Sequence, residues 1–247
     1  MFFFHWTFLL LIPAVILAIW AQAKVMGAYR RWSQVRAACG MTGAQVAIEM
    51  MRRAQLLAEV ERGNPTAAVR AAETLRAASV EMIGGQLSDH YDPRRNVLSL
   101  SEGVYASDSI AALGIAAHET GHAIQQAVGY PAVALRTTLV PAAQIGSTLA
   151  FPLFFIGLIF VRGSTLLMDI GILLYCAAVV FTLVTLPVEF DASRRALKML
   201  SAGGYLTEAE MPAARQVLSA AALTYVAAAL MAVLQLVRLL ILREERD

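Results

Sequence analysis

Charged residues are scarce in this sequence. They form 15% of its 247 residues, whereas 58% are hydrophobic and the mean hydropathy is +0.61. A soluble domain carries about a quarter charged residues, so the composition excludes an ordinary soluble protein and predicts a membrane protein with a modest water-exposed part. Apolar content this high also excludes an intrinsically disordered chain, because burial of apolar side chains can offset the entropy of the chain.

Cysteine, glycine and excess charge of either sign are limited too. The 2 cysteines and 16 glycines exclude a disulfide-stapled or collagen-like chain. The 20 basic and 18 acidic residues leave a net charge of +2, which is too small to indicate a nucleic-acid partner. We expect Cys39 in a cytoplasmic segment and Cys176 in a membrane helix, so no structural disulfide is predicted.

Long hydrophobic runs are abundant, and a membrane helix needs about 20 such residues. The runs that qualify cover residues 2–23, 137–161, 166–188 and 217–242. The first is interpreted as a retained anchor rather than a secretory signal peptide, because no basic residue precedes it. The second and third are close enough to form a tight helical hairpin. Gln235 and Arg238 interrupt the fourth, so it either spans with Arg238 reaching the interface or packs against other helices with partial exposure to lipid.

Basic residues close to these runs predict the orientation, since cytoplasmic flanks are enriched in Lys and Arg. They cluster after the first run, before the second and after the third. We therefore expect a bacterial inner (plasma) membrane protein with both termini outside the cytoplasm. Its predicted parts are a membrane helix at 1–23, a cytoplasmic segment at 24–136, a membrane hairpin at 137–188, a second cytoplasmic segment at 189–216, and a membrane helix with a short tail at 217–247.

The longer water-exposed segment has the patterns of three helices and two strands. The helices are expected at 42–62, 65–79 and 107–128, and the strands at 86–91 and 96–101 with a turn at 92–95. Thr42 is suited to cap the first helix. Alternation in the second strand predicts one buried face. The predicted fold class is therefore mainly α with a small β-sheet (α+β), built on about four transmembrane helices.

The third of these helices contains a metal-binding motif. His118 and His122 are spaced four residues apart, which places both imidazoles on one helical face, roughly 6 Å apart, within reach of one metal ion. Glu119 follows the first histidine, where the general base for a zinc-bound water is needed. The alternative is a histidine pair that only packs or titrates on a helix. The spacing favours a single Zn²⁺ ion.

A catalytic zinc ion takes three protein ligands, so a third must come from elsewhere in the chain. Glu189 follows the third hydrophobic run, and the hairpin returns the chain to the side that it left after the histidines. We therefore predict Glu189 as the third ligand. Its alternative role is a carboxylate at a helix interface, paired with Arg194 or Arg195.

Together these segments resemble the YugP-type membrane-bound neutral zinc metallopeptidases. The resemblance covers nearly the whole chain from Thr42 on and is carried by the motifs at 118–122, 186–193 and 88–93, with support from 97–105 and 221–227. It implies a compact gluzincin-like protease domain, with zinc on His118, His122 and Glu189 and with Glu119 as the base. A more distant similarity is to membrane proteases of the HtpX and CAAX-processing type.

The sequence departs from those distant relatives one turn after the glutamate ligand. They carry Asp there, where this chain has Ser193. Either Ser193 or Asp191 is therefore expected to support a ligand histidine. The alanine-rich stretch at 57–82 also looks less typical of the family.

Hydrolysis of a peptide also needs a donor to the oxyanion and a place for the substrate. The candidate donors are His90, Tyr225 and Arg194, although His90 would serve equally as a turn residue and Tyr225 as a packing aromatic. The strand around Val97, Leu98 and Ser99 is predicted to pair with an extended substrate, unless it is an ordinary sheet strand.

These features predict a membrane-embedded zinc metalloendopeptidase. Its partners would be a protein or peptide substrate, itself membrane-associated, and the lipid bilayer. The alternative is a zinc-binding membrane scaffold or chaperone on a degenerate protease fold, which would have no need of Glu119. A transporter is disfavoured because the four runs hold almost no charge.

Overall fold

The computed structural model describes residues 5–53, 65–161 and 164–246. These residues are mainly helical with one small three-stranded sheet, which confirms the predicted fold class. The chain divides into two compact units. A helical unit comprises Met1–Gln22, Ala134–Pro187 and Leu223–Asp247, and a sheet-containing unit comprises Ala23–Val133 and Val188–Ala222.

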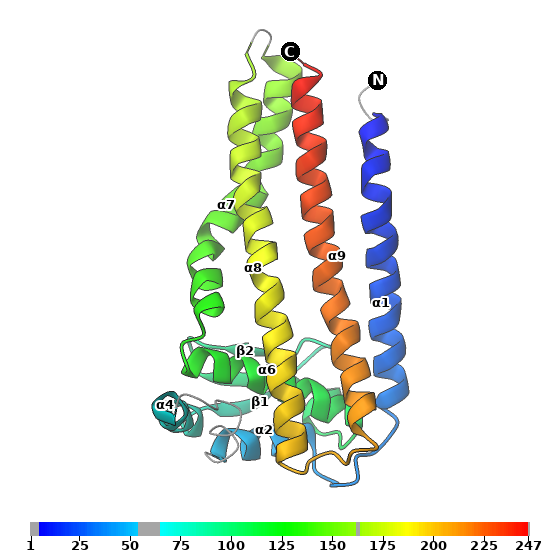
Figure 1. Cartoon of the computed structure of the whole chain (residues 1–247), viewed down its shortest axis with the longest axis vertical. Coiled ribbons are helices and arrows are strands. Elements are labelled where there is room, and N and C mark those ends of the chain that lie inside the picture. The colour runs from blue at the N-terminus through cyan, green and yellow to red at the C-terminus, as the bar shows by residue number, and fades with distance from the viewer. Residues whose placement is uncertain (1–4, 54–64, 162–163, 247) are drawn as a thin grey trace. The chain divides into compact units, whose positions relative to one another are not determined.

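Four helices are long and apolar enough to cross a membrane, as the hydrophobic runs predicted. They are α1 (Ile12–Trp32), preceded by the 3₁₀ turn η2 (Trp6–Leu11), α7 (Pro131–Phe160), α8 (Leu166–Ala202) and α9 (Met211–Glu244). In the helical unit their apolar parts run alongside one another (Figure 1). Helix α8 continues through Pro187 to Ala202, so the residues at 189–202 extend the helix that contains the third hydrophobic run.

Small residues let α7 and α8 approach closely in the helical unit, as the predicted hairpin requires. A Cβ atom on Gly146 would lie 2.2 Å from the Leu174 carbonyl oxygen, and one on Gly171 would lie 2.7 Å from that of Ala150. In a membrane the hydrophobic effect does not drive helices together, so glycines that let two backbones approach closely provide the packing contacts.

Most helices of the sheet-containing unit begin where the sequence indicates. Thr42 caps α2 (Gly43–Arg52) by a capping box with Gln45. The helix ends at Arg52. Residues 54–62 of the range predicted for it lie outside the described residues. Helix α4 (Pro65–Arg76) ends three residues early because Ser79 begins a strand. A short helix α5 (Glu102–Tyr105) precedes α6 (Ile110–Ala127). Ser109 caps α6 by accepting a hydrogen bond from the Ala112 N–H at 3.2 Å.

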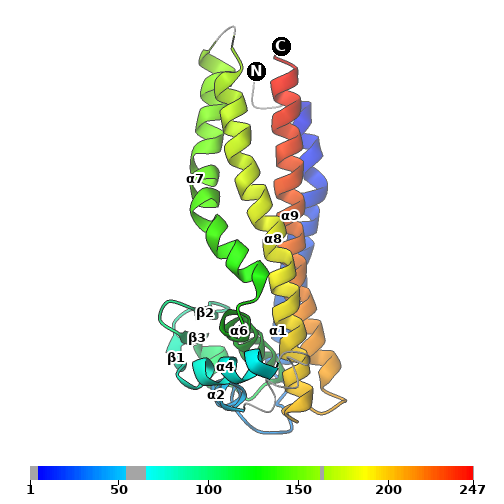
Figure 2. The same ribbon diagram turned by 60° about the vertical axis from the view of Figure 1, so that its left-hand side comes forward.

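The sheet corrects the strand predictions. Its order is β1 (Ser79–Ile83), β3 (Val97–Ser101) and β2 (His90–Asp92), with β1 parallel and β2 antiparallel to β3 (Figure 2). Strand β1 was not predicted, and the strand predicted at 86–91 is present only as β2. All five residues of β3 are buried, so the prediction of one buried face was also wrong.

The prediction of Val97, Leu98 and Ser99 as a substrate edge was wrong as well. Each of them pairs with β1 on one side and with β2 on the other. A strand whose backbone groups are satisfied on both sides cannot accept a further strand. The open edges of the described sheet are those of β1 and β2.

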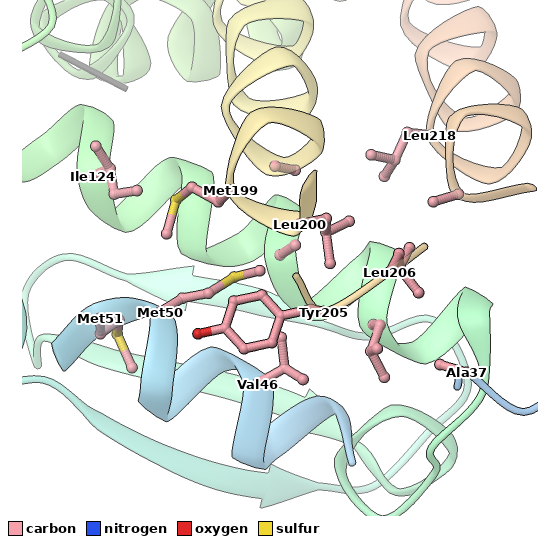
Figure 3. Packing of buried hydrophobic residues seen from close by; sticks show 14 of the residues in the cluster. Ala37, Val46, Met50, Met51, Ile124, Met199, Leu200, Tyr205, Leu206 and Leu218 are labelled. Carbon is pink, nitrogen blue, oxygen red and sulfur yellow. The ribbon is translucent and has the colours of Figure 1, made fainter. Parts of the chain in front are cut away.

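The main core of the sheet-containing unit joins α2, α6 and the C-terminal part of α8. Figure 3 shows Met50 of α2, Ile124 of α6 and Met199 of α8 within it, together with Tyr205 from the loop that follows α8. Met50 and Met199 are fully buried, and burying a side chain of this size contributes roughly 1.5–3 kcal/mol. This core fixes the histidine helix against the segment that follows Pro187.

Candidate metal centre

Helix α6 presents the two histidines on one face. The ring centroids of His118 and His122 are 4.7 Å apart and the rings are nearly perpendicular, at 85°. This arrangement lets both Nε2 atoms point to one position without contact between the ring faces. The predicted pairing of the two imidazoles at one site is present.

Glu189 of α8 completes a group of three ligand atoms. Its Oε2 lies 3.3 Å from Nε2 of His118 and 3.5 Å from Nε2 of His122, and the ligand atoms of the three residues lie within 4.8 Å of one another. Donors bound to zinc in a tetrahedron, at about 2.0–2.2 Å, are separated by roughly 3.3 Å. The spacing and the donor types, two imidazoles and a buried carboxylate, therefore fit a single Zn²⁺ ion.

Gly121 permits this meeting of α6 and α8. A Cβ atom at Gly121 would lie 2.6 Å from the carbonyl oxygen of Ala192, closer than real Cβ contacts allow. Ala192 is three residues beyond Glu189, so this close approach is about one helical turn from the ligand. The glycine inside the motif therefore sets how near the carboxylate comes to the imidazoles.

Glu119 is buried beside the ligands, with 9% of its surface exposed. Burial raises the pKa of its carboxyl group, and the nearby charges of Glu189 and Asp89 act in the same direction, against a lowering by His118 and His122. The carboxyl group therefore holds a proton more readily than a solvated glutamate.

Each histidine has a polar partner at Nδ1. Nδ1 of His118 lies 3.1 Å from the hydroxyl oxygen of Ser193, and Nδ1 of His122 lies 3.0 Å from Oε1 of Gln125. Because an amide oxygen only accepts, His122 donates from Nδ1, and its Nε2, on the side of Glu189, is left to bind a metal. Ser193 thus occupies the supporting position that the sequence left open between it and Asp191.

Gln125 was not predicted from the sequence. It is fully buried, and its Nε2 donates to the Val188 carbonyl oxygen at 2.8 Å and to Oδ2 of Asp191 at 2.9 Å. Asp191 therefore supports His122 indirectly, through this amide. Its position in the sequence could have indicated this role, because Gln125 follows His122 by three residues and therefore lies on the same helical face.

The two arginines near Glu189 both contact Asp191. Arg194 forms an ion pair with its Oδ1, and Nε of Arg195 lies 2.6 Å from its Oδ2. These contacts anchor the turn of α8 that follows the glutamate. Arg194 thus has a structural partner, and its assignment as an oxyanion donor stays a prediction.

Two other predicted residues are not members of the three-ligand group. His90 begins β2 and is exposed, with Nδ1 3.0 Å from the Ser88 carbonyl oxygen. Tyr225 belongs to the helical unit. Roles for His90 and Tyr225 in stabilising an oxyanion stay predictions.

Asp89, the residue before His90, is a further carboxylate of this region. It accepts hydrogen bonds from the Ser101 N–H at 2.7 Å and the Ser101 hydroxyl at 3.0 Å, which fixes the start of β2 to the end of β3. Burial raises its pKa. The charges of Asp89 and Glu119 are close enough for Asp89 to raise the pKa of the glutamate.

Comparison with known proteins identifies the family of the chain. A family model described as "Putative neutral zinc metallopeptidase" matches residues 7–64 and 62–244. The chain is 41% identical over 229 residues to the "Putative membrane protease YugP" of Bacillus subtilis (strain 168), covering 93% of this chain and 92% of that protein. No solved structure matches the chain. The chain thus belongs to the neutral zinc metallopeptidase family and is similar over nearly its whole length to a membrane protease.

Proposed function

We propose that the protein is a zinc metalloendopeptidase with one Zn²⁺ ion held by His118, His122 and Glu189. The observation that carries the proposal is the convergence of three ligand atoms within 4.8 Å beside the buried Glu119. When bound, zinc would supply an activated water and polarise the scissile carbonyl group. A scaffold would have no need of a carboxyl group buried at this position.

Glu119 would move the proton. As a carboxylate it accepts a proton from the attacking water at its carboxylate oxygen, and it then donates this proton to the nitrogen of the leaving amine. In the metal-free chain the raised pKa of Glu119 favours the first transfer, because a carboxylate whose conjugate acid has a higher pKa is a stronger base toward water. A solvated glutamate would release the proton to water more readily.

Ser193 and Gln125 would orient the ligands. Each fixes the Nδ1 side of one histidine and leaves Nε2 for the metal. We assign the binding of an extended substrate to the edge of β2 instead of β3. The outer edge of β2 is open in the described sheet, and β2 packs against α6. An extended peptide that adds to β2 would satisfy this edge and lie beside the histidine helix.

We further propose that the substrates are membrane-associated proteins and that the site faces the cytoplasm of a bacterial inner membrane. The apolar helices and the similarity to a membrane protease support the first statement. The basic residues that flank the hydrophobic runs support the second.

The test compares Glu119→Gln with the wild type and with Glu102→Gln, which changes an exposed glutamate in α5. We expect Glu119→Gln to keep one zinc per chain by elemental analysis while cleavage of a labelled unfolded protein falls at least about 100-fold. Glu102→Gln should match the wild type in both measurements. Cleavage at the wild-type rate by Glu119→Gln would refute the assigned base, and zinc-free wild-type protein with full activity would refute the metal mechanism.

A further inference from the structure

The helical unit contains a second site with polar side chains, formed by its own residues alone. A cavity of about 520 Å³ is lined by four apolar side chains and four polar ones. These residues are Phe155, Leu158, Ile159 and Leu242, and His5, Arg238, Glu245 and Arg246. All of them belong to the helical unit, and they come from its first residues, the end of α7 and the end of α9.

Arg238 is the unusual residue of this cavity. It is 5% exposed, and its Nε has no hydrogen-bond partner among the residues that the structure describes. Its guanidinium carbon lies 3.8 Å from the centroid of the Phe8 ring, which stabilises the cation without neutralising it. A buried guanidinium with an unused N–H is costly unless an anion or another acceptor reaches it.

The other charged groups at the cavity have partners. Glu245 accepts a hydrogen bond from Nε1 of Trp6 at 3.1 Å and lies 2.9 Å from Nε2 of His5. Arg246 donates to the carbonyl oxygens of Gly157, Leu158 and Val161 at the end of α7. Arg238 is therefore the charged group of this cavity that has a buried N–H without an acceptor among the described residues.

We propose that this cavity binds an anionic phospholipid, with its phosphate on Arg238 and its hydrocarbon against the apolar wall. A guanidinium donates well to phosphate, and Arg238 lies six residues before the end of α9, about 9 Å along the helix axis. That depth suits a headgroup beside a membrane helix. Ile159 is 50% exposed and lines the same cavity, so an acyl chain can lie against it from the membrane.

The experiment measures lipid retention by native mass spectrometry of the full chain in dodecyl maltoside. Dioleoylphosphatidylglycerol, dioleoylphosphatidylcholine and inorganic phosphate are added separately to the wild type, Arg238→Gln, Arg238→Lys and Arg243→Gln. Arg243 is the matched control, because it lies on the same helix end and pairs with Asp169 at 2.9 Å instead of lining the cavity.

We expect the wild type to retain phosphatidylglycerol over phosphatidylcholine. Arg238→Gln should lose about tenfold in affinity, the effect of one charge-assisted hydrogen bond, while Arg238→Lys and Arg243→Gln retain the lipid. Equal loss in Arg238→Gln and Arg243→Gln would overturn the proposal, because it would indicate a general charge effect. Retention by Arg238→Gln at the wild-type affinity would overturn it too.

A second variant separates lipid from free phosphate and does not remove the buried charge. Ile159→Trp adds bulk to the apolar wall and should reduce phosphatidylglycerol retention at an unchanged melting temperature. If inorganic phosphate displaces the lipid at equal concentration, or if Ile159→Trp binds the lipid as the wild type does, the site is not a phospholipid site.

Discussion

Replacing Gly121 by alanine tests whether the contact between α6 and α8 sets the metal geometry. The added Cβ atom would lie 2.6 Å from the Ala192 carbonyl oxygen and 3.2 Å from its carbonyl carbon and Cα. These atoms are backbone, so they cannot rotate away. The helices must separate by roughly 0.6 Å to reach a tolerable contact, whereas metal sites tolerate about 0.2 Å in their ligand distances.

Two opposing effects determine the change in the free energy of unfolding of Gly121→Ala. Alanine improves the helix propensity of α6 by about 0.8–1 kcal/mol, and overpacking costs about 1–3 kcal/mol. We therefore expect a net loss of up to about 2 kcal/mol in the free energy of unfolding, or a decrease of about 4–8 °C in Tm for a chain of this size. Separation of Glu189 from the histidines should weaken zinc binding by about 10- to 100-fold, the range seen when support of a metal ligand is lost.

Gly114→Ala is the matched control on the same helix. A Cβ atom at Gly114 would lie 3.9 Å from the nearest atoms, those of Ala214, which is ordinary van der Waals contact. This variant gains the same helix propensity without overpacking and should be neutral or stabilising. The assay is zinc competition with a fluorescent chelator, together with thermal unfolding of the zinc-free protein. If Gly121→Ala and Gly114→Ala gave the same zinc affinity and the same Tm, the close approach would not control the site.

Two further outcomes concern His122. Gln125→Met removes the acceptor for Nδ1 of His122 and should weaken zinc binding by about 10- to 100-fold, whereas the exposed neighbour substitution Gln126→Met should have no effect in the same chelator assay. Burial opposes protonation of His122, but hydrogen bonding to Glu189 and the charges of Glu119 and Glu189 raise its pKa above the usual value in the metal-free chain. Below that raised pKa, zinc must displace a proton, so its apparent Kd should increase about tenfold per unit of falling pH, and a pH-independent Kd from pH 8 to pH 5 would contradict this. The same proton stabilises the zinc-free fold at pH below the unfolded pKa and ceases to do so as pH rises through the folded pKa.

The parts of the site that depend on local spacing could be predicted from the sequence. The two histidines are four residues apart on one helix, and that spacing alone determines their shared face. Glu189 required a second step, from the order of hydrophobic runs to the side on which the chain returns. Its proximity to both imidazoles is seen in the structure.

The features that depend on contacts between segments far apart in the sequence could not be predicted. Strand β1 begins three residues after the last residue of α4. Met82 within it is 57% exposed, so the burial of its side chains does not alternate as expected of a half-buried strand. Its parallel pairing with β3 makes β3 the central strand, and the local pattern of a strand does not show which distant segments it pairs with. The role of Gln125 could not be predicted for the same reason, because its Nε2 donates hydrogen bonds to Asp191 and Val188, which are 66 and 63 residues away in the sequence.

The four carboxyl groups of the region differ in their hydrogen-bond and ion-pair partners. Asp89 is held by Ser101, Asp191 by Gln125 and two arginines, and Glu189 faces two imidazoles. Glu119 lies beside this set, and burial is the largest influence on its pKa, which it raises. Groups that are placed close together but in different surroundings divide acid–base work between them. Of the four, Glu119 is the one to which the proposed mechanism gives the transfer of protons, whereas the contacts of Asp89 and Asp191 fix strands and ligands in place.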